Sequence, residues 1–230
     1  MFRELLSIFR SDEPLGRMAA NFSRMLKLAN ELTVKAGDIY FGDRPTPDER
    51  TEVYKRDVKV NKLERKIRKQ VIAHLSVHGT SADLPYALVL MSLVKDAERI
   101  GDYAKNLAET LDVAGVTLPD DELVGELREI RAGVESALAT AGEVFATSDQ
   151  EEAIDLIRQG RDLTHRCDVL LTRVARSDHN AATTTALVLG TRFYKRIGAH
   201  LLNILSSVVM PLHKLDYYDE KLLEGAKDRS

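Results

Sequence analysis

Two acidic side chains, Glu98 and Asp102, lie four residues apart in the middle of the chain. On a helix, residues at this spacing project from neighbouring turns of one face. Like charges at that distance repel by roughly 0.2–0.5 kcal/mol, and the nearby Arg99 and Lys105 can offset the repulsion. Taken alone, the pair is typical of a solvated, salt-bridged helix face.

A second polar stripe precedes this pair, at Asp57, Asn61 and Glu64, with the spacing i, i+4 and i+7. If the two helices are antiparallel neighbours, both stripes border the same groove. Clusters of oxygen ligands suit hard or borderline cations such as Mg²⁺, Mn²⁺ or iron, although Asn61 contributes only a neutral carbonyl. The sequence therefore contains a candidate metal site made of five residues: Asp57, Asn61, Glu64, Glu98 and Asp102.

Other kinds of site have weaker support in the residue types. A di-iron centre of the ferritin type needs Glu-x-x-His repeats, and neither Glu64 nor Glu98 begins one. His74 and His78 have a spacing that suits either zinc or a polar helix end. Cys167 lies inside a predicted helix and is expected to be buried. The sequence has no phosphate-cradling loop and no nucleophile elbow, so we expect no enzymatic activity.

Composition places the chain among ordinary globular proteins. Of its 230 residues, 44% are hydrophobic and 30% are charged, and the net charge of −3 argues against a nucleic-acid partner. A single cysteine excludes an internal disulfide and fits a reducing, cytoplasmic compartment. No apolar run approaches the roughly 20 residues that cross a bilayer. Residues 1–14 form an amphipathic segment, which we interpret as a short helix rather than a signal peptide.

Proline positions and helical periodicity predict six long helices and no strands. We expect the helices at residues 15–41, 49–78, 83–112, 121–147, 150–176 and 181–210. Ser81 or Asp83 can cap the third helix, and Pro85 lies in its first turn. This helix carries an apolar seam with strict spacing of four and three residues: Tyr86, Leu90, Leu93, Ala97, Ile100, Ala104, Leu107 and Leu111.

The last helix repeats this seam, at Gly190, Tyr194, Ile197, Leu201, Ile204 and Val208. A shift of 97 residues, from Arg99 to Arg196, superposes the two seams and both Arg-Ile-Gly triplets. We therefore predict an all-α fold of six long antiparallel helices, arranged as two tandem three-helix bundles related by an internal repeat. The predicted parts are a first bundle at 15–115, a second bundle at 119–211 and a C-terminal tail at 212–230.

The segment from Asp96 to Glu109 reads DAERIGDYAKNLAE. It resembles the signature Asp-Leu-Glu-Arg-Ile-Gly-Asp-His-Ala-x-Asn-Ile-Ala-Glu of the PhoU family. Residues 57–64 are similar to the acidic second helix of that family, and the duplicated three-helix organisation extends the resemblance over most of the chain.

The resemblance implies a cytoplasmic regulator that dampens phosphate-starvation signalling. It implies contact with the ATPase of a Pst-type phosphate ABC transporter, and through the transporter peripheral contact with the membrane. A PhoR-type sensor kinase is the second implied partner, and a homodimer is expected. The resemblance also implies a metal ion (Fe, Mn, Mg or Zn) bound on the bundle surface through Glu/Asp-x-x-x-Asp motifs.

The second repeat departs from the family pattern. Lys195 and Ala199 stand where the pattern has Glu and Asp, while Asp162 and Asp168 remain on the preceding helix. We expect one metal site rather than two, with Lys195 supplying a fixed positive charge in the second repeat. Two alternatives remain open: a carboxylate-bridged metal-handling bundle, and a helical scaffold unrelated to phosphate.

Overall fold

The computed structural model describes residues 14–42, 46–77 and 79–216. Within these ranges the chain is all-α, with six long helices and no strand, as predicted. None of these helices combines the length and the apolar character needed to span a membrane. The predicted N-terminal segment before Pro14, residues 217–230 of the predicted tail, and His78 lie outside the described residues. The helices are α2 (Pro14–Phe41), α3 (Pro47–Val77), α4 (Leu84–Ala114), α5 (Glu122–Thr147), α6 (Gln150–Ala175) and α7 (Ala181–Val209), followed by the short 3₁₀ helix η1 (Leu212–Lys214).

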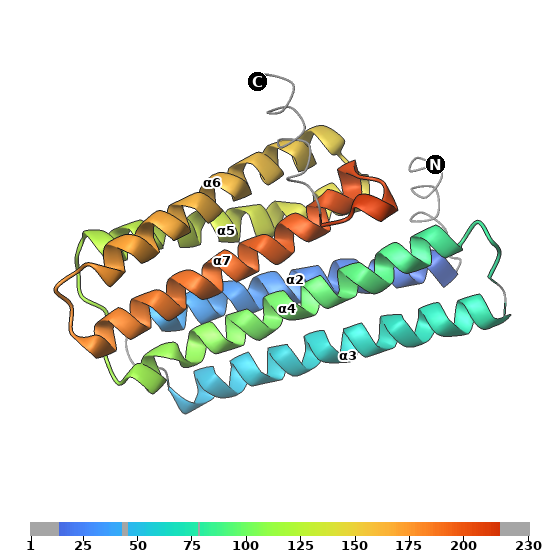
Figure 1. The fold of residues 1–230 in the computed structure, drawn as a ribbon. Coiled ribbons are helices and arrows are strands. Elements are labelled where there is room, and N and C mark those ends of the chain that lie inside the picture. Colours follow the sequence, from blue (N-terminus) through green and yellow to red (C-terminus); the bar gives the residue numbers. More distant parts are fainter. Residues whose placement is uncertain (1–13, 43–45, 78, 217–230) are drawn as a thin grey trace, which may run out of the picture.

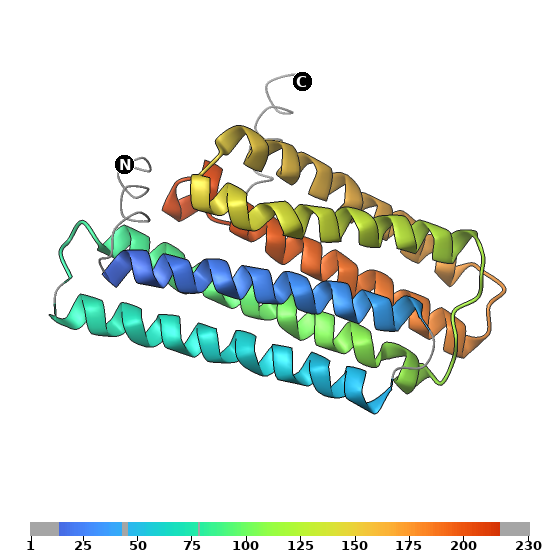
Figure 2. The same cartoon turned by 180° about the vertical axis from the view of Figure 1, so that it is seen from behind.

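The two repeats pack side by side along their lengths. Helices α4 and α7 lie next to each other in the middle of the molecule, with α3 at one outer edge and α6 at the other (Figure 1). Seen from behind, α2 and α5 cover the opposite face (Figure 2). The most extensive helix–helix contact joins α4 to α7, and a single hydrophobic core includes residues of both repeats. Because this core is shared, it does not separate the two predicted bundles, and their division at 15–115 and 119–211 stays a prediction.

Local sequence accounts for the helix ends. Helix α4 has Asp83 at its N-cap position and Pro85 in its first turn, but the Asp83 side chain does not cap the helix. It accepts instead from the backbone N–H of Thr80, 2.8 Å away. Helix α4 ends at Ala114 and is followed by the C-cap residue Gly115, whose φ of 66° is a left-handed conformation that favours glycine. Among the described residues, four other helices have side-chain N-caps: Thr46, Asp121, Asp149 and Asn180.

The predicted apolar seams form the core. All eight seam residues of α4 and all six of α7 are buried. Ile100 and Leu107 on α4 and Ile197 on α7 are 0% exposed. Complete burial of one such side chain stabilises the fold by about 1.5–3 kcal/mol. The spacing of apolar residues thus predicted correctly which face of each helix packs inward.

Specific contacts also fix one repeat against the other. The Tyr40 hydroxyl on α2 donates to the Ala186 carbonyl on α7 at 2.9 Å. Gly190 lies one turn further along α7, where a Cβ atom would overlap the Tyr40 phenol. Arg131 on α5 pairs with Asp38 on α2. These contacts show that the position of the second repeat depends on side chains that are far apart in the sequence.

Candidate functional site in the groove between α3 and α4

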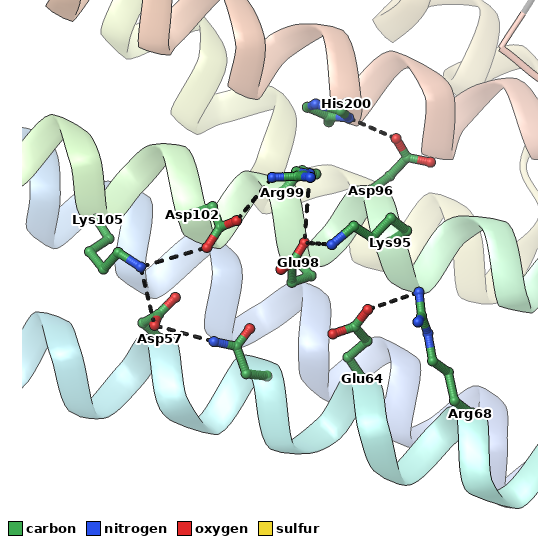
Figure 3. A network of polar contacts seen from close by, with 11 residues as sticks. Asp57, Glu64, Arg68, Lys95, Asp96, Glu98, Arg99, Asp102, Lys105 and His200 are labelled. Atoms are coloured by element: carbon green, nitrogen blue, oxygen red, sulfur yellow. Dashed lines mark hydrogen bonds and ion pairs between the residues drawn. The ribbon is translucent and has the colours of Figure 1, made fainter.

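The predicted metal-ligating residues lie along the facing sides of α3 and α4, a region that we call the groove. Figure 3 shows four of them, Asp57, Glu64, Glu98 and Asp102. Lys105 connects the two sides, because its Nζ lies 3.6 Å from Asp57 Oδ2 on α3 and 3.6 Å from Asp102 Oδ1 on α4. The antiparallel arrangement of the two helices accounts for this proximity. Along the groove, α3 contributes Asp57, Asn61 and Glu64, and α4 contributes Glu98 and Asp102.

The carboxylates of the groove have basic partners. Glu98 Oε2 lies 2.6 Å from Lys95 Nζ, and Glu64 Oε1 lies 2.9 Å from Arg68 Nη2. In the part of the chain that the structure describes, no three side chains of His, Cys, Asp or Glu are grouped so that they could hold a metal ion. The groove therefore takes the form of a network of ion pairs.

Asp57 and Asn61 differ from the other residues of the groove because each keeps an unsatisfied acceptor. Asn61 Nδ2 donates to Asp57 Oδ2 at 3.3 Å, whereas Asp57 Oδ1 and Asn61 Oδ1 are buried without a hydrogen-bond partner. Burial raises the pKa of Asp57 above its ordinary value, the positive charge of Lys105 opposes the rise, and the charge of Asp102 adds to it. Two buried oxygen acceptors without donors are the type of atom that a hard cation prefers as a ligand, but these two residues alone do not form a metal site.

The corresponding position in the second repeat contains an internal ion pair. Lys195 on α7 stands at the place of Glu98, and its Nζ pairs with Asp168 on α6. Ala199, at the place of Asp102, offers no ligand. An ammonium group of the chain itself thus supplies the positive charge here, as the sequence predicts for Lys195. Asp162, the other acid retained on α6, is exposed.

A polar cluster that the sequence interpretation missed lies where α4 meets α7. Asp96 is only 7% exposed, and its Oδ1 lies 2.8 Å from His200 Nδ1 and accepts from Asn203 Nδ2 at 3.0 Å. The Tyr103 ring stacks on the His200 ring, with 5.7 Å between the centroids. The partners of Asp96 are 104 and 107 residues away, so no local pattern reveals them. The one available signal was the repeat, which superposes Asn106 on Asn203.

Two further predictions concern Cys167 and His74. Cys167 is 1% exposed, as expected, and burial raises the pKa of its thiol to about 12. His74 Nε2 lies 3.2 Å from Asp83 Oδ2. This contact agrees with the interpretation of His74 as part of a polar helix end. The alternative of a zinc pair with His78 falls on a residue outside the described ranges.

Comparisons with known proteins show which family and fold the chain resembles. Residues 15–111 match the family model described as the PhoU domain. A phosphate-specific transport system accessory protein PhoU homolog from Xylella fastidiosa (strain Temecula1 / ATCC 700964) is 28% identical over 211 residues, which cover 88% of this chain and 85% of the relative. The fold is similar to the crystal structure of PhoU from Pseudomonas aeruginosa, with a TM-score of 0.76, 20% identity and coverage of 87% of this chain and 97% of that one. It is also similar to the phosphate transport system regulatory protein PhoU from Streptococcus pneumoniae, with a TM-score of 0.72, 18% identity and coverage of 84% and 92%.

Proposed function

We propose that this chain, a member of the PhoU family, is a non-enzymatic adaptor that dampens phosphate-starvation signalling and restrains phosphate uptake. The observation that carries the proposal is the complete acidic signature on α4, within the matched residues 15–111. This signature borders the groove with α3 and leaves Glu98 and Asp102 partly accessible at the surface.

The proposed partners are the ATPase of a Pst-type phosphate transporter and a PhoR-type sensor kinase. Binding to the transporter would bring the protein to the membrane surface without a spanning segment. A homodimer is part of the proposal. The proposed location of all these contacts is the cytoplasm, because a transporter ATPase and the kinase domain of a sensor act there.

The proposal includes a metal ion in the groove. Asp57 and Asn61 would hold it through the acceptors that now lack donors, together with Glu64, Glu98 and Asp102. An all-oxygen set favours Mg²⁺, Mn²⁺ or iron over zinc. The ion would replace Lys95 and Lys105 as the positive charge that balances the carboxylates of the groove. The two lysine side chains are 43% and 24% exposed and can turn toward water.

Such an ion would clamp α3 to α4, since ligands come from both helices. When bound, it would supply positive charge and oxygen coordination. A partner protein that binds at the groove could then respond to the metal ion. This response requires that the partner bind the metal-bound arrangement and the lysine-bridged arrangement with different affinities.

The test is a comparison of two charge-matched variants. Glu98→Gln/Asp102→Asn removes the acidic pair of the groove, and Glu151→Gln/Asp155→Asn removes an exposed pair with the same spacing on α6. We expect only the first variant to lose binding to the transporter ATPase and the sensor kinase in pull-down experiments. The adaptor function is refuted if the wild type binds neither protein and deletion of its gene leaves phosphate-responsive expression unchanged.

The metal part of the proposal has a separate readout. A cation at a free concentration of 100 times its Kd stabilises the folded state by about 2.7 kcal/mol. Titration with Mn²⁺, Mg²⁺ or iron should therefore raise the Tm of the wild type and of the α6 control, but not of Glu98→Gln/Asp102→Asn. Equal Tm shifts in all three proteins, or no shift in any, would exclude a metal site in the groove while leaving the adaptor function open to its own test.

A further inference from the structure

Helix α3 presents a positively charged side to solvent. Between residues 54 and 77 the only acids are Asp57 and Glu64, and both are buried. Arg56 and Arg68 are half-buried and pair with Glu52 and Glu64. The other charged residues of the central turns are basic and exposed, and their spacing of three or four residues keeps them on one side of the helix. We call this set the α3 lysine face: Lys55, Lys59, Lys62, Arg65, Lys66 and Lys69. It extends over about 21 Å at 1.5 Å per residue.

The α3 lysine face has no acidic partners among the residues that the structure describes. Within the described residues none of its six cations forms an ion pair, and Lys66 only donates to the side-chain carbonyl of Asn21 at 3.2 Å. Basic residues of α6 behave differently, since Arg158 pairs with Asp155 and Arg166 pairs with Glu126. The chain as a whole has a net charge of −3, so the sign of charge on this face is opposite to that of the chain.

The position of α3 leaves this face accessible. Helix α3 lies at an outer edge of the molecule (Figures 1 and 2) and packs against α2 and α4. Apolar side chains accompany the cations, because Tyr54 is 50% exposed, Val58 45% and Ile72 61%. Cations combined with exposed apolar side chains are typical of helices that bind in the headgroup layer of a membrane.

We propose that the α3 lysine face docks on an anionic phospholipid bilayer. A bilayer surface is broad and uniformly negative, so one straight helix at the edge of the bundle can bring all its cations to it together. Five of the six cations are lysines, whose flexible ammonium groups suit diffuse headgroups better than the paired geometry that arginine favours.

This docking requires neither the metal ion nor a transporter. Its test uses the full chain and protein-free vesicles, either of phosphatidylcholine alone or of phosphatidylcholine mixed with phosphatidylglycerol, in a sedimentation assay. Each lysine near an anionic surface contributes about 1 kcal/mol, or about fivefold in affinity. A variant without four of them should bind several-hundred-fold more weakly. The variant is Lys55→Gln, Lys59→Gln, Lys62→Gln and Lys69→Gln.

A matched control removes the same charge from the other repeat. It carries Arg158→Gln, Arg176→Gln, Arg192→Gln and Arg196→Gln, at exposed positions on α7 and on or just after α6. We expect the wild type and the control to bind the vesicles that contain phosphatidylglycerol, and not the neutral ones. Binding should weaken as salt is added, because the contact is electrostatic.

Three results would overturn the proposal. The first is no binding of the wild type to anionic vesicles, and the second is an equal loss in the α3 variant and the control. The third is binding to native membranes but not to protein-free vesicles, which would identify an acidic protein as the partner. Circular dichroism checks that the variants fold. If the α3 variant does not, Lys62→Glu with Arg192→Glu as its control decides the same question.

Discussion

Replacing Asp96 with alanine removes a buried carboxylate that joins α4 to α7. The carboxylate is 7% exposed and is in contact with two side chains of the other repeat, His200 and Asn203. A hydrogen bond to a charged group contributes about 1.5–3 kcal/mol. The His200 side chain is 20% exposed, so water can replace part of what it loses. We therefore expect Asp96→Ala to lower the free energy of unfolding by about 3 kcal/mol.

This loss is large enough to measure in two ways. For a chain of this size, 1 kcal/mol shifts Tm by about 2–4 °C, so the variant should melt roughly 6–12 °C below the wild type. Urea denaturation followed by far-ultraviolet circular dichroism gives the free energy directly. Asp120→Ala, at an exposed acid between α4 and α5, is the control and should change stability by less than about 0.5 kcal/mol.

A double-mutant cycle tests the mechanism. Asp96→Ala and Asn203→Ala should each be destabilising, and the double variant should lose less than their sum by more than about 1 kcal/mol, because the same contact is removed twice. The reasoning is wrong if Asp96→Ala is no more destabilising than Asp120→Ala, or if the effects of Asp96→Ala and Asn203→Ala are additive.

Three other expectations concern the groove, the glycines and the cysteine. Burial raises the pKa of the Asp57 carboxyl, so its contribution to stability is present when it is protonated and is lost as pH rises through the folded-state pKa. In metal-free buffer, thermal melts should show that the Tm of Asp57→Asn rises relative to that of the wild type as the pH increases above about 4, the ordinary pKa of an aspartate. Gly190→Ala should destabilise by about 1–3 kcal/mol or more through its overlap with Tyr40, whereas Gly125→Ala, which meets nothing within 4 Å, should stabilise by about 0.5–1 kcal/mol in urea titrations. Cys167, with its thiol pKa raised to about 12, should resist iodoacetamide in the native protein and react fully in denaturant, as mass spectrometry would reveal.

Helix positions could be predicted from the sequence because they depend on short-range physics. Proline excludes itself from helix interiors, and a seam such as that from Tyr86 to Leu111 must face the core wherever it lies, because apolar spacing of four and three residues follows the turn of a helix. The Asp83 cap was predicted less well. Its side chain has competing donors nearby at Thr80 and His74, and residue type alone does not reveal which of them it binds.

The groove was predicted in part. Residue spacing correctly indicated that Asp57 and Asp102 would border the same groove. The basic partner of each carboxylate could not be predicted from spacing. Lys95, Arg99 and Lys105 all lie close to the acids in sequence, and each of these long side chains can reach more than one carboxylate. The orphaned acceptors of Asp57 and Asn61 were also beyond sequence reasoning, since burial depends on how α3 packs against α4.

The acidic pair Glu98 and Asp102, the duplicated seams and the loss of that pair at Lys195 and Ala199 are properties of the sequence alone, since each depends on residue type and helical spacing. The joining of the repeats through Asp96 and His200 arises only in the folded chain, because it brings together residues 104 positions apart. The same holds for the raised pKa of Asp57, which results from the removal of water by neighbouring helices. Local periodicity shaped the helices, and packing at long range gave their charged residues distinct environments.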